Sequence, residues 1–211
     1  MRNLLENTQK KIQSEAKLVL RIKKDPWFFL TNFCYTKDEH DLRRPYKLFP
    51  RHEYLRRIVD IWMAENLLLI PKSRKMLVTW LFVCLNLWLI SYHRGSGAAF
   101  ISEKEDDSDS LIERAYQVYI RLRCPHPELK RKHLLLISEG MDSQIKGFSQ
   151  NPNIVRMHTF TSAFVDEGAF QGEMEKLYAA LKPTIDGGGK LVIASTSNGK
   201  EIFYRLCNDI Q

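Results

Sequence analysis

The sequence predicts an α/β fold: a mostly parallel β-sheet flanked by helices, with a helical and aromatic arm at the N-terminus. Its 211 residues are 44% hydrophobic and 27% charged, the composition of an ordinary globular chain. From residue 52 onward, short apolar runs alternate with segments of helical periodicity. The runs are continuously apolar, as in strands that helices cover on both faces. This alternation is typical of a doubly wound sheet in one large domain.

The first 48 residues are expected to form an arm on the main domain, which would occupy residues 49–211. Residues 1–24 place apolar side chains at roughly helical spacing and stop before Pro26, which predicts an amphipathic helix. Asp25–Pro50 is rich in proline and aromatic residues, which predicts an irregular segment that packs on the main domain.

Five strands with helices between them are predicted in the main domain. The strands are Leu67–Ile70, Ala98–Ile101, Leu134–Ile137, Ala163–Val165 and Leu191–Ala194. The helices are His52–Glu65, Leu77–Ile90, Asp107–Arg123 and Glu173–Lys182. The most apolar helix is shorter than the about 20 residues that a membrane span needs, so we expect it to be buried. Ligands of such sheets bind beyond the carboxyl ends of the strands, which makes the polar segments there candidate sites.

The net charge and the cysteine content limit the functions that the chain could have. The net charge of +7 favours an anionic partner such as nucleic acid, although many other proteins share such an excess. The four cysteines lie 50, 40 and 83 residues apart, without the close pairs of a zinc or redox motif, so buried reduced thiols are expected. The polar N-terminus lacks the apolar region of a secretory signal, which predicts an intracellular protein.

A basic, hydroxyl-containing loop follows the first predicted strand. It contains Lys72, Ser73, Arg74 and Lys75, and Thr79 stands at the start of the next helix. A helix start of this kind can hold phosphate through backbone N–H groups and a cation, while the Thr hydroxyl ligates Mg²⁺. The loop lacks the glycines of the usual phosphate loop, so a solvated basic turn is the alternative.

Two further polar segments follow later strands. Asp166 and Glu167 end one apolar run, where one carboxylate can hold Mg²⁺ while the other activates a water molecule. Ser195, Thr196 and Ser197 follow the last run and could sense a γ-phosphate. Taken singly, an acidic loop and a plain turn are the alternatives. Their order along the chain, with all three segments expected at one sheet edge, favours a nucleotide site.

This ordered set resembles the ATPase domain of the large terminase subunit of tailed bacteriophages, the motor that packages DNA. The resemblance covers about residues 45–205. Four stretches carry it: FPRH at 49–52, PKSRKMLVTW at 71–80, GFSQNPNIVRMHTFTSAFVDEGAF at 147–170, and YAALKPTIDGGGKLVIASTSNG at 178–199. It implies a P-loop NTPase-like sheet that binds ATP and Mg²⁺ and hydrolyses ATP.

The resemblance also implies roles for residues of the sheet edge. Asp166 and Thr79 would hold Mg²⁺, Glu167 would activate water, and Ser195–Ser197 would couple hydrolysis to movement. Val78 stands where the usual loop has lysine, so Lys72, Arg74 or Lys75 would replace that cation, with Arg74 favoured. Leu77 replaces a usual glycine, and Ser197 replaces a proline.

Residues farther from that edge also receive roles by resemblance. Arg156, eleven residues before Glu167, would reach a neighbouring subunit's nucleotide as an arginine finger; a surface ion pair is the alternative. Phe49, Arg51 and His52 would flank the adenine, with packing an equal alternative for Phe49.

The same resemblance implies partners and a setting. The expected partners are double-stranded DNA, the portal protein, the small terminase subunit and further copies of the chain in a ring, with no membrane, in the host cell cytoplasm. No nuclease domain is expected, so the chain would be an excised motor domain or a naturally short relative. The alternatives are a helicase-like ATPase, which needs two motor lobes, and a non-hydrolysing nucleic-acid-binding or assembly module, which the glycine-free loop suggests.

Overall fold

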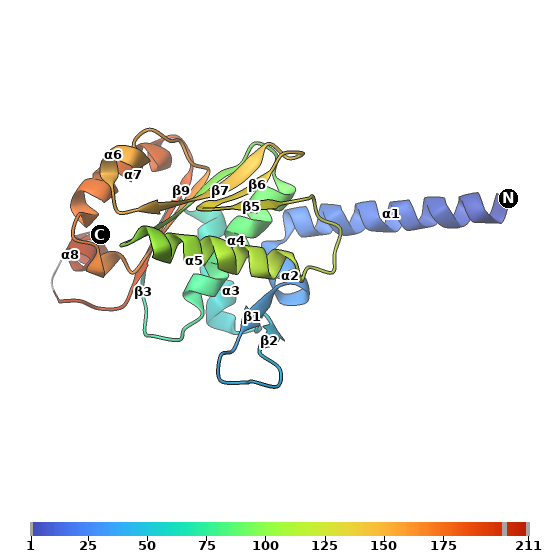
Figure 1. Ribbon diagram of the computed structural model, residues 1–211, viewed down its shortest axis with the longest axis horizontal. Helices are drawn as coiled ribbons and strands as arrows, with labels where there is room; N and C mark the ends of the chain where they lie inside the picture. Colours follow the sequence, from blue (N-terminus) through green and yellow to red (C-terminus); the bar gives the residue numbers. More distant parts are fainter. Residues whose placement is uncertain (1, 200–201, 210–211) are drawn as a thin grey trace.

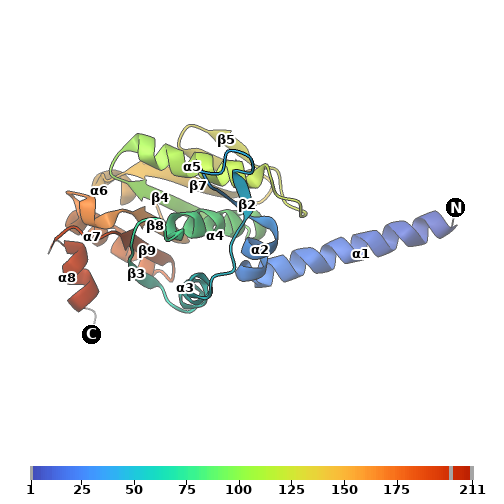
Figure 2. The same ribbon diagram turned by 90° about the horizontal axis from the view of Figure 1, so that it is seen from below.

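A seven-stranded sheet lies between two layers of helices in the computed structural model, which describes residues 2–199 and 202–209 (Figures 1 and 2). The helices are α1 (Arg2–Lys24), α2 (Pro26–Phe33), α3 (Glu53–Ala64), α4 (Val78–Tyr92), α5 (Glu105–Tyr119), α6 (Pro152–Val155), the 3₁₀ turn η1 (Gly168–Phe170), α7 (Met174–Asp186) and α8 (Ile202–Asp209). The strands are β1 (Tyr35–Lys37), β2 (Tyr46–Leu48), β3 (Leu67–Pro71), β4 (Gly97–Ser102), β5 (Lys130–Lys132), β6 (Leu135–Ser138), β7 (Ser143–Ser149), β8 (Ser162–Asp166) and β9 (Lys190–Ser195).

The sheet has the order β3-β9-β8-β4-β7-β6-β5. Strands β3, β9, β8, β4 and β7 run parallel to one another, whereas β6 pairs antiparallel with β7 and β5 pairs antiparallel with β6. The predicted fold class, a mostly parallel sheet flanked by helices, is therefore confirmed. The order places β3, β9 and β8 side by side, although their sequence positions are far apart.

The strand predicted at Leu134–Ile137 is confirmed as β6, but it runs antiparallel within the mostly parallel sheet. Leu134 adopts a positive φ of 52°, and β6 begins one residue later as the middle strand of an antiparallel meander between β5 and β7. Strand β7 was missed because its polar residues Gln144 and Lys146 interrupt the apolar run, yet it pairs with β4 along its whole length. The apolar-run criterion misses strands in which polar and apolar residues alternate.

The N-terminal segment is more regular than expected. Helix α1 matches its prediction and extends away from the domain, but Asp25–Pro50 contains a helix and a two-stranded hairpin instead of an irregular chain (Figure 1). Asp25 caps α2 by accepting a hydrogen bond from the N–H of Phe28 at 2.8 Å, and Pro26 follows at the first helical position, where it is tolerated. Phe29 and Leu30 are fully buried in the same core as α4.

Successive residues of the central strands face two different cores. On β4, Phe100 packs with α4 and α5, whereas Ile101 packs with α7. Helix α4 is buried almost entirely, as predicted, since it lies between the sheet and the N-terminal helices. Among the described residues, no helix combines the length and the hydropathy that a membrane span requires. Cys34, Cys84 and Cys124 are free and buried, and Cys207 is free and half-buried.

Candidate functional site

Strand register brings three polar segments to one edge of the sheet. Pro71 at the end of β3 pairs with Ser195 at the end of β9, and Asp166 at the end of β8 pairs with Ala194. The N–H of Lys72 donates to the carbonyl of Ser195 at 2.9 Å, which continues the ladder by one residue. The chain segments that follow β3, β8 and β9 therefore start within a few ångströms of one another.

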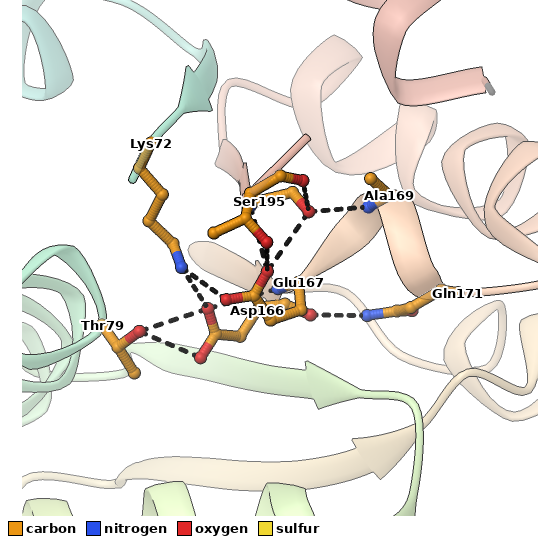
Figure 3. Close-up of polar contacts among 8 residues, drawn as sticks. Lys72, Thr79, Asp166, Glu167, Ala169, Gln171 and Ser195 are labelled. Carbon is orange, nitrogen blue, oxygen red and sulfur yellow. Dashed lines mark hydrogen bonds and ion pairs between the residues drawn. The ribbon is translucent and has the colours of Figure 1, made fainter. Parts of the chain in front are cut away.

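Asp166, at the end of β8, faces Thr79 in the first turn of helix α4 (Figure 3). The Thr79 hydroxyl lies 3.0 Å from Oδ2 and 3.2 Å from Oδ1 of Asp166. The Nζ of Lys72 lies 3.9 Å from Oδ1. Burial raises the pKa of the Asp166 carboxyl above its ordinary value, and the Lys72 ammonium and the Thr79 hydroxyl oppose this effect only in part. The site thus holds a buried carboxylate that is incompletely neutralised.

Glu167 turns back toward the same site because its backbone is left-handed, with φ 50° and ψ 48°. One carboxylate oxygen, Oε1, pairs with Lys72 Nζ at 2.6 Å, and the other, Oε2, accepts from the Thr196 N–H at 3.0 Å and the Thr196 hydroxyl at 3.2 Å. Burial acts to raise the pKa of Glu167, but these hydrogen bonds outweigh it and hold the pKa below the ordinary value. Glu167 is therefore ionised and occupied on both oxygens.

The segment after β9 is joined to the turn after β8. The hydroxyl of Ser195 accepts from the N–H of Ala169 at 3.0 Å and lies 3.3 Å from Glu167 Oε2. Asn198 donates its side-chain amide to the carbonyl of Ala169 at 3.0 Å. Among the residues that the structure describes, the side chain of Ser197 makes no such contact and is exposed. The segment thus places the side chains of Ser195, Thr196 and Asn198 against the acidic turn.

Two clefts border this cluster. The larger, of about 970 Å³, lies between the loop after β3, helix α5 and the β1–β2 hairpin, and Lys72, Ser73, Lys75 and Thr79 line it. The smaller, of about 500 Å³, lies on the other side of the acidic pair, and Asp166, Glu167, Thr196 and Arg74 line it. The larger cleft lies within the range typical of sites for small-molecule ligands.

The loop after β3 adopts a backbone that normally favours glycine. Lys75 has φ 64° and Leu77, which caps helix α4, has φ 56°. The sequence analysis identified Leu77 as the replacement of a usual glycine, and the structure retains the left-handed conformation there without one. A left-handed non-glycine residue costs about 1–2 kcal/mol. The loop therefore contains two strained left-handed residues.

The loop cation nearest the carboxylates is Lys72, whose side chain is only 9% exposed. Arg74, which the sequence analysis favoured, is exposed and lines the smaller cleft instead. Lys72 directly follows β3, so its side chain extends along the sheet edge toward Glu167. The geometry favours Lys72 over Arg74 as the cation for an anionic ligand.

The residues assigned near the adenine divide between core and surface. Phe49 is buried, with its ring 6.5 Å from that of Trp27 in an edge-on arrangement, which favours the packing alternative. Arg51 is exposed and donates to the Asn32 side chain at 3.2 Å. His52 lines the larger cleft and stacks on Tyr54, with ring centroids 5.6 Å apart.

Arg156 lies away from these clefts. It directly follows the short helix α6, its side chain is exposed, and it forms no ion pair with any described residue. The surface ion pair considered as its alternative role is thus not observed among the described residues.

Two residues near the site were missed by sequence reasoning. The hydroxyl of Tyr54 donates to the carbonyl of Met76 at 3.2 Å and so holds the strained loop. Arg114 of α5 lines both clefts, lies 5.7 Å from the Trp80 ring, and lowers the pKa of Asp166 by its charge. Neither residue belongs to a polar segment after a strand. Only helical periodicity, which places Arg114 at the edge of the buried face of α5, could have singled it out.

Solved structures that share this fold include large terminases of phages and one large terminase ATPase domain. The large terminase ATPase domain of Thermus phage P74-26 matches with a TM-score of 0.60 and 17% identity, over 74% of this chain and 69% of that chain. The large terminase of bacteriophage HK97 matches with a TM-score of 0.65 and 12% identity, over 89% of this chain and 40% of that one. A large terminase from a thermophilic bacteriophage matches with a TM-score of 0.56 and 9% identity, over 76% and 42%.

This chain has the fold of phage large terminase ATPase domains. The match covers 40% of the HK97 terminase chain. No family model matches the sequence. The resemblance that the motifs implied is thus confirmed at the level of the fold, at identities too low to transfer an activity or the role of a residue.

Proposed function

We propose that this chain is an ATP-hydrolysing motor domain of a DNA-packaging terminase. The observation that carries the proposal is the convergence of Lys72, Thr79, Asp166 and Glu167 at one sheet edge, beside a cleft lined by the loop after β3. A cation, a hydroxyl at a helix start and two strand-end carboxylates are the groups that phosphoryl transfer from ATP to water requires.

The donor set fits Mg²⁺. Asp166 is a carboxyl whose pKa burial raises, so a cation would stabilise its ionised form, and the Thr79 oxygen lies beside it. Among the described residues no cluster of three or more His, Cys, Asp or Glu side chains could hold a metal, which agrees with an ion that takes its remaining ligands from phosphate and water. Bound Mg²⁺ would neutralise charge on the β- and γ-phosphate oxygens.

Glu167 and Lys72 would exchange partners when ATP binds. In this structure Lys72 neutralises Glu167 at 2.6 Å. A triphosphate in the larger cleft would attract the Lys72 ammonium, because a multiply charged anion binds it more strongly than one carboxylate does. Glu167 Oε1 would then be free to orient a water molecule and accept its proton, while Thr196 keeps Oε2 in place.

The loop after β9 would transmit the result of hydrolysis. Thr196 contacts Glu167, and Ser195 and Asn198 contact Ala169 in the next turn. A change in the position of Glu167 therefore displaces β9 and the chain that follows it. By the same proposal, Arg156 would act on a neighbouring subunit in a ring, with double-stranded DNA, a portal protein and a small terminase subunit as partners in the host cell cytoplasm.

Steady-state phosphate release and equilibrium ATP binding test the proposal, with and without Mg²⁺ and duplex DNA. Glu167→Gln should lower turnover by about 10²–10⁴-fold and leave ATP binding within about threefold, since it removes the base and keeps the shape. Glu173→Gln, an exposed acid outside the two clefts, is the matched control. ATP binding without turnover under every condition would favour the non-hydrolysing module instead.

A further inference from the structure

Most of the net positive charge of the chain resides in helix α1. Arg2–Lys24 contains seven Lys and Arg residues and two Glu residues, a net charge of +5, against +7 for all 211 residues. The helix extends away from the domain in both views (Figures 1 and 2). Residues 9–17 are all exposed, so this part of α1 contacts no other described element.

The cations of α1 form a row on one face. Lys10, Lys17, Arg21 and Lys24 recur at the helical period, whereas Lys11 and Lys23 point in other directions. The row extends over about 21 Å, since a helix rises about 1.5 Å per residue. Between residues 9 and 24, none of these cations forms an ion pair with a described residue. The row is therefore free to bind an external anion.

The base of α1 is fixed to the domain. Ile22 is fully buried, and its carbonyl accepts from the indole N–H of Trp88 at 2.7 Å. The guanidinium of Arg21 lies 3.8 Å from the centre of the Phe28 ring. Trp88 belongs to α4, whose first turn contains Thr79. Helix α1 is thus a supported extension of the domain that contains the candidate nucleotide site.

An apolar partner fits α1 poorly. Between residues 9 and 24 the exposed large apolar side chains are Ile12, which is 60% exposed, and Leu20, which is 58% exposed. Burial of two such side chains contributes at most about 3–6 kcal/mol, less than the about 8 kcal/mol that a micromolar complex requires. A regular array of phosphates needs only the cations. Duplex DNA carries one negative charge per about 1.7 Å of its axis, so the row can meet several phosphates at once.

We propose that the Lys10–Lys17–Arg21–Lys24 face of α1 binds the phosphate backbone of duplex DNA, as a contact separate from the nucleotide site. Such a contact carries no sequence preference and weakens as salt is added, because each phosphate contact releases counterions. The proposal does not depend on the ATPase function, since DNA can bind α1 without nucleotide.

Two double variants of the full chain test the row directly. Lys10→Gln/Lys17→Gln removes two charges from the row, and Lys11→Gln/Lys23→Gln removes the same two charges from the same helix outside it. All four lysines are exposed, so both variants should fold, which circular dichroism can check. The probe is a short mixed-sequence DNA duplex, titrated without nucleotide at several salt concentrations.

The row variant should bind the duplex at least about tenfold more weakly near 0.1 M salt. Its plot of log affinity against log salt concentration should have a slope shallower by about 1.8. The control variant should change the affinity by less than about threefold. Equal loss in both variants, or loss in neither, would overturn the assignment of the row. An unchanged DNA affinity together with a shift in oligomeric state for Ile12→Ser would overturn it in favour of self-association. ATP turnover without DNA, measured in parallel, separates this result from any failure of the ATPase proposal.

Discussion

The loop after β3 and the turn after β8 start at the same sheet edge and share a strained backbone, yet they are supported very differently. Lys75 and Leu77 in the loop and Glu167 in the turn all have positive φ. Three side chains hold the turn: Ser195 accepts from the Ala169 N–H, Asn198 donates to the Ala169 carbonyl, and Gln171 donates to the Asp166 carbonyl at 2.8 Å. In the loop, the Lys72 backbone and side chain and the Met76 carbonyl make the contacts, and the residues between them are exposed.

This difference indicates separate roles. Hydrogen bonds within the fold compensate the backbone strain of the turn, so Asp166 and Glu167 are positioned before any ligand arrives. The strained loop has few such hydrogen bonds, so an anion that binds the loop backbone would supply the missing contacts. The turn is a preformed part of the site, and the loop is the part that a ligand completes.

The largest expected effect is a difference in ATP affinity between variants of Lys72 and Arg74. Lys72→Met should weaken ATP binding by about 10–100-fold, because a charge-assisted contact contributes about 1.5–3 kcal/mol. Arg74→Met, the matched change two residues away, should alter the Kd by less than about threefold. Isothermal titration with ATP and Mg²⁺ measures both. The reverse order of effects would return the role to Arg74.

A larger side chain at Gly168 should disrupt the packing of the turn after β8. A Cβ there would lie 2.5 Å from Cγ2 of Ile193, so Gly168→Ala should lower the free energy of unfolding by about 1–3 kcal/mol. Gly172→Ala is the control, since a Cβ at Gly172 meets nothing within 4 Å, and its effect should stay within about 0.5 kcal/mol. Urea denaturation gives both values. Similar values for the two variants would show that the turn can yield.

The two acids should affect stability with opposite dependence on pH. Glu167 has a folded-state pKa below 4.5, so its ionic contacts stabilise above that pH and the benefit is lost as the pH falls. Asp166 has a folded-state pKa above 3.8, so its ionisation destabilises as the pH rises through that folded-state value.

Glu167→Gln should therefore cost up to about 1 kcal/mol at pH 7 and less at pH 3.5, whereas Asp166→Asn should gain stability relative to the native chain over the same rise in pH. Denaturation without nucleotide or Mg²⁺ at the two pH values measures this. Parallel pH trends for the two variants would contradict the assigned environments.

The smallest expected effect concerns strain in the loop. Lys75→Gly should raise the free energy of unfolding by about 0.5–1 kcal/mol, because glycine tolerates φ 64° without the steric cost. Ser73→Gly, at an exposed loop position without a positive φ, should instead lower it by up to about 1 kcal/mol. Thermal denaturation of the two variants compares them. A loss of stability in both would mean that the left-handed conformation carries little strain.

The sequence predicted the parts of the fold that periodicity encodes. Leu67–Ile70, Ala98–Ile101, Ala163–Val165 and Leu191–Ala194 all lie within strands of the sheet, because buried parallel strands must be continuously apolar. Strand β7 escaped this criterion, since its Gln144 and Lys146 are only partly buried near the antiparallel edge. Helix α2 escaped because the proline and aromatic content of its segment suggested loop structure, although Pro26 starts the helix.

By itself, the sequence determined that a basic, an acidic and a hydroxyl-bearing segment follow three apolar runs. A parallel sheet brings such segments to one edge. Only the tertiary structure decided which side chains meet there. The contact of Lys72 with Glu167 depends on the pairing of Pro71 with Ser195 and on the left-handed turn at Glu167. Strand register and positive φ at non-glycine residues arise from the packing of the whole chain, so a local pattern of residues does not predict them.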